Sequence, residues 1–185
     1  TADQLEQKNF TKIVVMTLSP RQADRSTVEN ALVAELGDEG IEAVPSASLF
    51  PVEFFEEEKG RTDLERQLDE AGADALLTVN LLDVDHYPNL VATDPVFDPI
   101  TAYPYYGYWY DYYDYWYPNV YTDAYLTATT QVVTETNLYD LSTGELIWSA
   151  QSSTVDPETI FEWANAYADE VADRIEELGL MSPMS

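Results

Sequence analysis

The sequence predicts a single α/β domain over residues 1–185, with a mixed sheet of about five strands, three main helices and a tyrosine-rich insertion. Three observations support this fold class. Apolar runs alternate with helical repeats along the first half of the chain, a long β-hairpin pattern follows, and a 3.6-residue apolar repeat ends the chain. The chain is long enough to bury a core without disulfides, and it contains no cysteine.

The chain opens with a strand and a helix. Residues 12–19, KIVVMTLS, form a continuous run of mostly branched apolar residues, which is typical of a centrally buried strand. A helix is expected over residues 26–36. Ser26 and Glu29 have the spacing of a capping box at its start, and Gly37 follows its last apolar residue as a stop signal.

Another strand, helix and strand are expected next. The second strand is irregular, and Pro45 suggests an edge position because proline donates no hydrogen bond to a neighbouring strand. A capping box of Thr62 and Glu65 opens the second helix, which Gly72 ends. An apolar run over residues 75–84 predicts the third strand. It should lie parallel to the first strand, because a helical crossover joins such strands.

The second half of the chain predicts a hairpin and a helix. Residues 126–139 alternate in period two, and residues 145–155 form the antiparallel return strand. Gly144 supplies a turn residue that accepts positive φ. The apolar repeat then predicts a long helix over residues 156–178, which Gly179 ends.

An insertion over residues 86–123 shows neither period. Within it, residues 103–121 hold ten tyrosines and two tryptophans in nineteen positions. An extended backbone would send neighbouring rings to opposite sides, so one set would pack on the domain and the other would face solvent. A self-packing flap, a recognition surface and a disordered loop are the three interpretations. The candidate ligand-binding residues are Tyr105, Tyr106, Tyr108, Trp109, Tyr110, Tyr112, Tyr113, Tyr115, Trp116 and Tyr117.

The charge of the chain limits its partners. Thirty-five acidic residues face eight basic ones, which gives a formal net charge of -27. Such a surface repels nucleic acid and anionic membranes, so neither is expected as a partner. Solubility is the simpler interpretation of the acidity, and a patch for a cation or a basic partner is the alternative.

Catalytic signatures are absent from the sequence. Asp83, Asp85 and His86 are grouped as a divalent cation would require, but a solvated strand end is the better interpretation of them. His86 is the only histidine, and no serine lies in a nucleophile elbow. We therefore expect no enzyme, no catalytic residue, no metal site and no cofactor, with a metal-dependent hydrolase as a distant alternative.

Two segments carry a family resemblance. They are residues 72–77, GADALL, and the hairpin signatures Tyr139-Asp140, Thr143-Gly144 and Trp148. With the order of elements around them, they resemble a recurring bacterial envelope domain. It occurs in the N-terminal domain of the Tol system's periplasmic propeller protein, in the curli-secretion lipoprotein and in outer-membrane lipoprotein activators of peptidoglycan synthases. The resemblance covers nearly the whole chain outside the insertion.

The resemblance implies a location and a kind of function. Its members suggest a periplasmic or outer-membrane lipoprotein whose acylated cysteine would lie just before Thr1, with residues 1–11 as a polar lead-in and the lipid as the only membrane attachment. The expected function is that of a non-enzymatic binding or assembly accessory, with the aromatic flap as recognition surface and an envelope protein or glycan as partner. A glycan- or peptidoglycan-binding module that uses the tyrosines is the alternative.

Overall fold

The described residues form a five-stranded mixed sheet with two α-helices on each face. The computed structural model describes residues 9–18, 22–50, 61–83, 107–121, 132–151 and 160–181. The strands are β1 (Lys12–Leu18), β2 (Glu42–Pro45), β3 (Ala75–Asp83), β4 (Val132–Asp140) and β5 (Leu146–Gln151). The helices are α2 (Gln22–Asp38), the 3-10 turn η1 (Ser46–Ser48), α4 (Arg61–Glu70), α6 (Trp109–Tyr121) and α7 (Ile160–Glu177).

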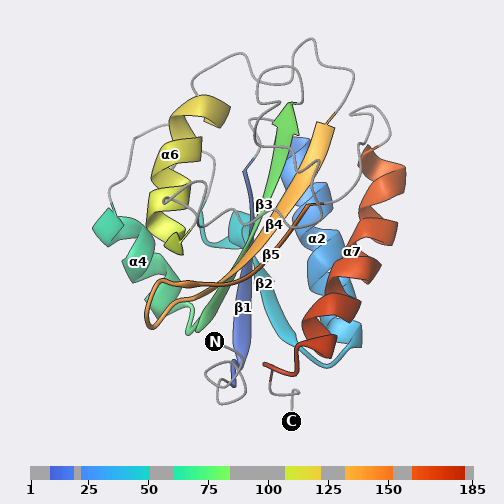
Figure 1. The fold of residues 1–185 in the computed structure, drawn as a ribbon, viewed down its shortest axis with the longest axis horizontal. Helices are drawn as coiled ribbons and strands as arrows, with labels where there is room; N and C mark the ends of the chain where they lie inside the picture. Colours follow the sequence, from blue (N-terminus) through green and yellow to red (C-terminus); the bar gives the residue numbers. More distant parts are fainter. Residues whose placement is uncertain are drawn as a thin grey trace.

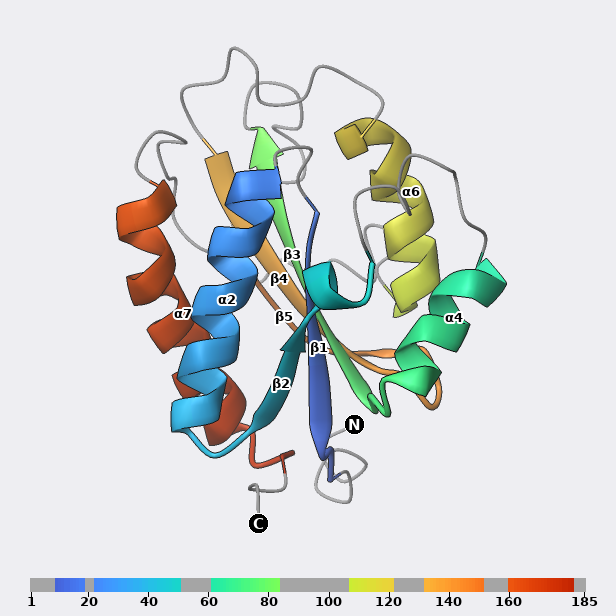
Figure 2. The same cartoon turned by 180° about the vertical axis from the view of Figure 1, so that it is seen from behind.

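The sheet has the strand order β2-β1-β3-β4-β5. β1 pairs in parallel with β2 and β3, while β3, β4 and β5 pair antiparallel in succession. This confirms the expected parallel neighbours, the hairpin and the edge position of the strand that contains Pro45. The crossovers from β1 to β2 and from β2 to β3 run in opposite directions, so right-handed connections place α2 and α4 on opposite faces. Figures 1 and 2 show α2 with α7 on one face and α4 with α6 on the other.

The first helix differs from the prediction at both ends. α2 begins at Gln22, so Ser26 lies inside it and the expected capping box of Ser26 and Glu29 is wrong. Gly37 also lies within the helix, and Gly40, with φ of 78°, follows its end instead. The stop signals Gly72 and Gly179 and the turn residue Gly144 are confirmed, because all three have positive φ.

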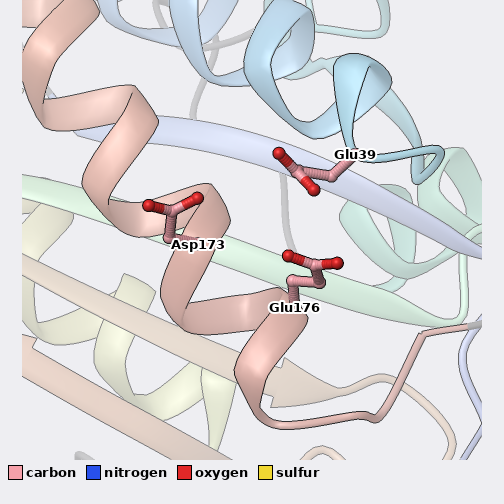
Figure 3. A group of neighbouring side chains, drawn as sticks. All are labelled: Glu39, Asp173 and Glu176. Carbon is pink, nitrogen blue, oxygen red and sulfur yellow. The ribbon is translucent and has the colours of Figure 1, made fainter.

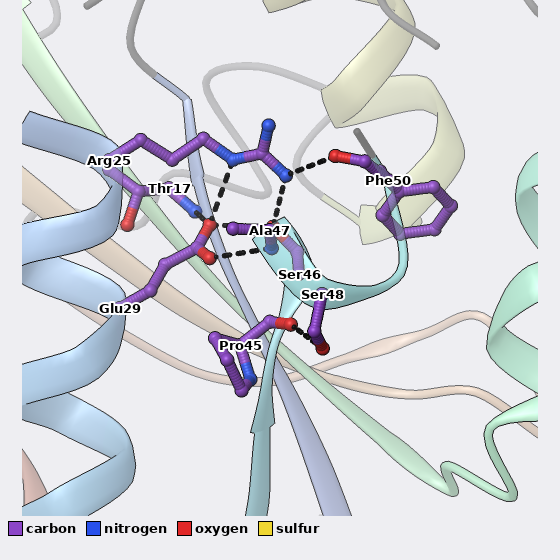
Figure 4. A network of polar contacts seen from close by, with 8 residues as sticks. All are labelled: Thr17, Arg25, Glu29, Pro45, Ser46, Ala47, Ser48 and Phe50. Carbon is purple, nitrogen blue, oxygen red and sulfur yellow. Dashed lines mark hydrogen bonds and ion pairs between the residues drawn. The ribbon is translucent and has the colours of Figure 1, made fainter. Parts of the chain in front are cut away.

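Glu29 serves a buried polar network rather than a helix cap (Figure 4). Its Oε1 accepts hydrogen bonds from the backbone N of Thr17 at 2.9 Å, from Nε of Arg25 at 3.2 Å and from the hydroxyl of Ser46 at 2.5 Å. Its Oε2 accepts from the backbone N of Ala47 at 2.9 Å. Both Glu29 and Arg25 are buried. This network fastens α2 to the end of β1 and to η1.

A fourth helix, α6, lies inside the insertion, where we expected three main helices and an extended aromatic backbone. Trp109, Tyr112, Tyr113 and Trp116 are all buried. Counted from Trp109, the other three lie three, four and seven residues further on, which is the spacing of the buried stripe of an amphipathic helix. Tyr112 and Tyr113 are adjacent in sequence and both buried, which an extended strand would not allow. The extended backbone was therefore the wrong prediction.

β4 is buried on both sides, although its sequence alternates. Residues 134–140 are all buried. On one side the hydroxyl of Tyr112 in α6 donates a hydrogen bond to Glu135, and on the other side Thr136 and Tyr167 of α7 share a hydrogen bond. The alternating side chains of this strand therefore point to two faces that are both covered by helices, and neither face is exposed to solvent.

Several sequence predictions fall outside the described residues. They include Asp85 and His86, the rings of Tyr105 and Tyr106, and the start of the last helix before Ile160. In the part of the chain that the structure describes, none of the helices combines the length and the apolar character that a membrane crossing requires.

Candidate functional site

The aromatic helix α6 is anchored at its start by the β4–β5 hairpin. The backbone N of Trp109 donates to the carbonyl of Gly144 at 2.9 Å, and Tyr108 forms a backbone bridge with Glu145. Gly144 has φ of 78°, and a Cβ there would lie 3.6 Å from the ring of Tyr108 and 3.7 Å from that of Trp109. These distances are ordinary van der Waals contacts, so it is the positive φ of the turn that favours glycine at this position.

The inner face of α6 packs its rings on the sheet. The ring of Tyr112 lies 6.1 Å from that of Tyr139 on β4 and 6.3 Å from that of Trp116, and its hydroxyl donates to Oε1 of Glu135 at 2.6 Å. Each fully buried ring contributes roughly 1.5–3 kcal/mol of hydrophobic free energy. The rings of Trp109 and Tyr113 are buried as well, so that four buried rings hold the helix in place.

The outer face of α6 combines exposed aromatic rings with carboxylates. Tyr108 and Tyr115, at 49% and 41% exposure, are the exposed large hydrophobic side chains among the described residues. Asp111 and Asp114 are also exposed. At 100° per residue, the aspartates occupy the middle of the outer face with Tyr115 beside them, while Tyr110 is half-buried at its other border. The ring of Tyr115 stands edge-on to Trp116 at 5.1 Å, which limits its freedom.

An open groove of about 630 Å³ lies between α4 and the start of α6. Its walls include Glu65 and Asp69 of α4, the ring of Trp109, and Ser142 of the hairpin turn. Asp74, also in the wall, accepts hydrogen bonds from the backbone N atoms of Thr11 and Lys12 at 2.8 and 2.9 Å. The groove therefore adds further carboxylates near the hairpin turn that supports Tyr108.

A second acidic cluster lies on the other face of the molecule (Figure 3). Glu39, after α2, has carboxylate oxygens within 4.8 Å of those of Asp173 and Glu176 on α7. The charge of Glu176 raises the pKa of Glu39 above its ordinary value. All three side chains are exposed, and exposed carboxylates of this kind are common without an ion. We therefore interpret the cluster as three surface carboxylates that repel one another.

The structure divides the ten candidate ligand-binding residues. Trp109, Tyr112, Tyr113 and Trp116 belong to the core, Tyr110 is half-buried, and Tyr108 and Tyr115 face solvent. Tyr105 and Tyr106 lie outside the described residues, and α6 includes Tyr117 without a described side chain. Sequence reasoning missed Asp111 and Asp114 as members of the site, although the helical spacing of the buried rings places both on the opposite face.

The candidate cation group named from the sequence is not assembled by the described residues. Asp83 ends β3, its side chain is not described, and Asp85 and His86 follow outside the described ranges. The described residues include no histidine, so no pair of nucleophile and histidine can be traced among them. The absence of catalysis stays a prediction.

The chain has low similarity to several solved structures. No family model and no curated protein matches its sequence. The chain is similar to lipoprotein GNA1162 from Neisseria meningitidis, at 16% identity and a TM-score of 0.40, over 88% of this chain and 97% of that one. It is also similar to TolB from Acinetobacter baumannii, at 10% identity and a TM-score of 0.41, over 92% of this chain and 29% of that one. Both likenesses are low, and neither carries a conclusion about the function of this chain.

Proposed function

We propose that this protein is a non-enzymatic binding or assembly accessory of the bacterial envelope, and that the outer face of α6 contacts its partner. One observation carries the proposal. Tyr115 on the anchored helix and Tyr108, the residue just before its start, face solvent beside Asp111 and Asp114. Exposed aromatic side chains on a fixed element are typical of recognition surfaces, because they give contact area at a low cost in conformational entropy.

The anchoring of α6 favours binding. The buried rings and the hydrogen bond from Trp109 to Gly144 fix the helix before any partner arrives. A preorganised surface loses less conformational freedom on association, so more of its contact energy contributes to affinity. The hydrogen bond between Tyr112 and Glu135 fixes the rotation of the helix about its own axis.

The charges on this face favour a protein partner with a basic segment. Arginine and lysine form charge-assisted hydrogen bonds with carboxylates and stack on aromatic rings. Asp111 and Asp114 lie next to exposed rings, and the net charge of -27 would attract a basic partner from a distance. A glycan would instead favour a floor of coplanar exposed rings. Within the described ranges, the exposed rings are Tyr108 and Tyr115, and they lie seven residues apart along the chain.

The assignment to the envelope rests on the sequence resemblance. Two residues of its signatures stabilise the fold of this chain. Asp74 accepts hydrogen bonds from the backbone at the start of β1, and Asp140 accepts them from the backbone N and the hydroxyl of Ser142 in the hairpin turn. Because these roles belong to the shared fold, the partner must be found by experiment.

Photo-crosslinking in the source cell tests the proposal. A photoreactive residue in place of Tyr115 should give a discrete protein adduct, which mass spectrometry identifies. The same residue in place of Asn165, exposed on α7 at the other face of the sheet, should not give that adduct. Asp111→Asn with Asp114→Asn should weaken the adduct at position 115. Equal adducts at both positions, or co-sedimentation with purified peptidoglycan that depends on Tyr115, would replace this proposal.

A further inference from the structure

Four polar side chains meet on the face of the sheet that α6 covers. The register of β3 and β4 pairs Thr78 with Asn137 and Asn80 with Glu135. Directly opposed residues of antiparallel strands project to the same side, and residues two apart on one strand do so too. Thr78, Asn80, Glu135 and Asn137 therefore form one group, the polar quartet, and each is at most 1% exposed.

α6 lies over the polar quartet. The Tyr112 hydroxyl donates to Oε1 of Glu135 at 2.6 Å, so the quartet lies on the same side as the inner face of the helix. On the neighbouring strand, Nε2 of Gln151 donates to Oε2 of Glu135 at 3.0 Å. Hydrogen bonds from two elements, α6 and β5, thus orient the Glu135 carboxylate.

Among the residues that the structure describes, the side-chain amides of the two asparagines of the quartet stand out because they make no hydrogen bond. Neither Nδ2 nor Oδ1 of Asn80 is bonded, and the same holds for Asn137, although both residues are fully buried. An unsatisfied buried polar group destabilises the folded state, and folded proteins contain few of them. Two such amides beside a buried carboxylate indicate that a polar species belongs among them.

We propose that the polar quartet binds a hard cation of the calcium or sodium class. The ligand oxygens are the amide oxygens of Asn80 and Asn137, a carboxylate oxygen of Glu135 and the hydroxyl of Thr78. Opposed side chains in such a pair start from Cβ atoms about 4.5–5.5 Å apart. Oxygens on opposite sides of a calcium ion are also about 5 Å apart, because each lies roughly 2.3–2.6 Å from the metal.

The chemistry of the quartet selects this class of ion. All four ligands offer oxygen, which suits hard cations, and none offers the nitrogen or sulfur that softer transition metals prefer. Magnesium retains several of its waters, so a fully buried site disfavours it. A cation beside Glu135 also offsets the cost of burying the negative charge of that carboxylate. The net charge of -27 raises the cation concentration around the protein.

This site differs from the acidic groups described above. It contains neither Asp83 nor His86, and it lies on the opposite face of the sheet from Glu39. It does not rest on the proposed function, because it concerns the inner face of α6 rather than the outer one. A bound cation would stabilise the buried carboxylate of Glu135, which accepts the hydrogen bond from the Tyr112 hydroxyl. It would thereby help to hold α6 on the sheet.

Thermal unfolding of three proteins tests the site. Wild type, Glu135→Gln and the surface control Glu39→Gln are unfolded with chelator and refolded in tetramethylammonium chloride, which frees them of bound metal. Calcium chloride or sodium chloride is then added at constant ionic strength. At about a hundred times the Kd, wild type and Glu39→Gln should gain roughly 5–10 °C in Tm over the tetramethylammonium reference. Glu135→Gln should gain less than a quarter of this. The salt that raises the Tm of wild type, calcium chloride or sodium chloride, identifies the ion.

Two outcomes overturn the proposal. One is a wild type that responds to neither ion beyond the tetramethylammonium reference, and the other is a Glu135→Gln protein that responds as strongly as wild type. Asn137→Leu provides a second test if Glu135→Gln fails to fold. A ligand role predicts that this variant loses the cation response. An amide that binds nothing predicts a higher Tm with the wild-type response unchanged, because leucine removes the unsatisfied group.

Discussion

Replacing Trp116 by alanine should destabilise the protein strongly, whereas the same change at its neighbour Tyr115 should not. Trp116 is fully buried and lies 6.3 Å from the ring of Tyr112. Truncation of a buried tryptophan costs about 3–5 kcal/mol, which includes the cavity left behind. Tyr115 is 41% exposed and loses mainly its edge-on contact with Trp116, a pair interaction of about 0.5–1.5 kcal/mol. The difference between the two variants should therefore reach about 1.5 kcal/mol or more.

Urea unfolding followed by circular dichroism measures this difference. Both variants should keep the wild-type m-value, so that the shift in midpoint reports stability alone. A domain of this size has about 5–15 kcal/mol to lose, so Trp116→Ala should still fold in the absence of urea. Equal losses for the two variants, or a larger loss for Tyr115→Ala, would show that the helical packing of α6 described here is incorrect.

Three further predictions concern ionisable groups. Glu29→Gln should lower the free energy of unfolding by about 3–5 kcal/mol in urea titrations, because the buried Arg25 guanidinium loses its charged partner; a loss under about 1 kcal/mol would contradict this. Glu176 raises the pKa of Glu39, so the folded state binds that proton more tightly and stability falls as pH rises through the titration of Glu39. Glu39→Gln should accordingly raise the Tm at neutral pH and low salt, and the gain should vanish in acid; a constant gain would refute the repulsion. Burial raises the pKa of Tyr167, so the stability it contributes is present below the unfolded pKa of about 10 and is lost above it. Tyr167→Phe should lose less stability than wild type between about pH 9 and pH 11 in alkaline denaturation, and parallel losses would contradict this.

The arrangement of the sheet could be predicted because burial leaves a strong mark on sequence. The runs in β1 and β3 are mostly apolar, and their described side chains from Ile13 to Leu18 and from Ala75 to Asn80 are buried, as in strands that helices cover on both sides. The start of α2 could not be predicted in the same way. A capping box and a buried ion pair both place a glutamate near the beginning of a helix, and only the position of Ser46 and Thr17 in space shows which role Glu29 has.

The helical nature of α6 was hidden by its composition. Tyrosine and tryptophan are weak helix formers, and Pro118, inside the helix, is a residue that normally breaks one. The helix is indicated only by the spacing of Trp109, Tyr112, Tyr113 and Trp116. That spacing places all four rings on the face that packs on the sheet. Asp111 and Asp114 share a face with exposed rings only because this segment is helical, so an extended backbone does not predict that arrangement.

The polar quartet was missed for a related reason. Asn80 and Asn137 occur in strands where an alternating polar residue normally faces water. Their burial depends on a helix from a distant part of the chain, so it follows from tertiary structure rather than from any local pattern. The pairing of Asn80 with Glu135 also requires the register between β3 and β4, which the sequence alone does not fix.

The central claim is that the outer face of α6 binds the partner, and recovery of the crosslinked partner with purified variants tests it most directly. Tyr108→Ser with Tyr115→Ser removes the exposed rings while the buried rings of α6 stay in place. This double variant should recover less than about a tenth of the partner that wild type recovers, which corresponds to about 1.4 kcal/mol or more of lost binding, while its Tm stays within a few degrees. Undiminished recovery by a folded double variant would contradict the claim.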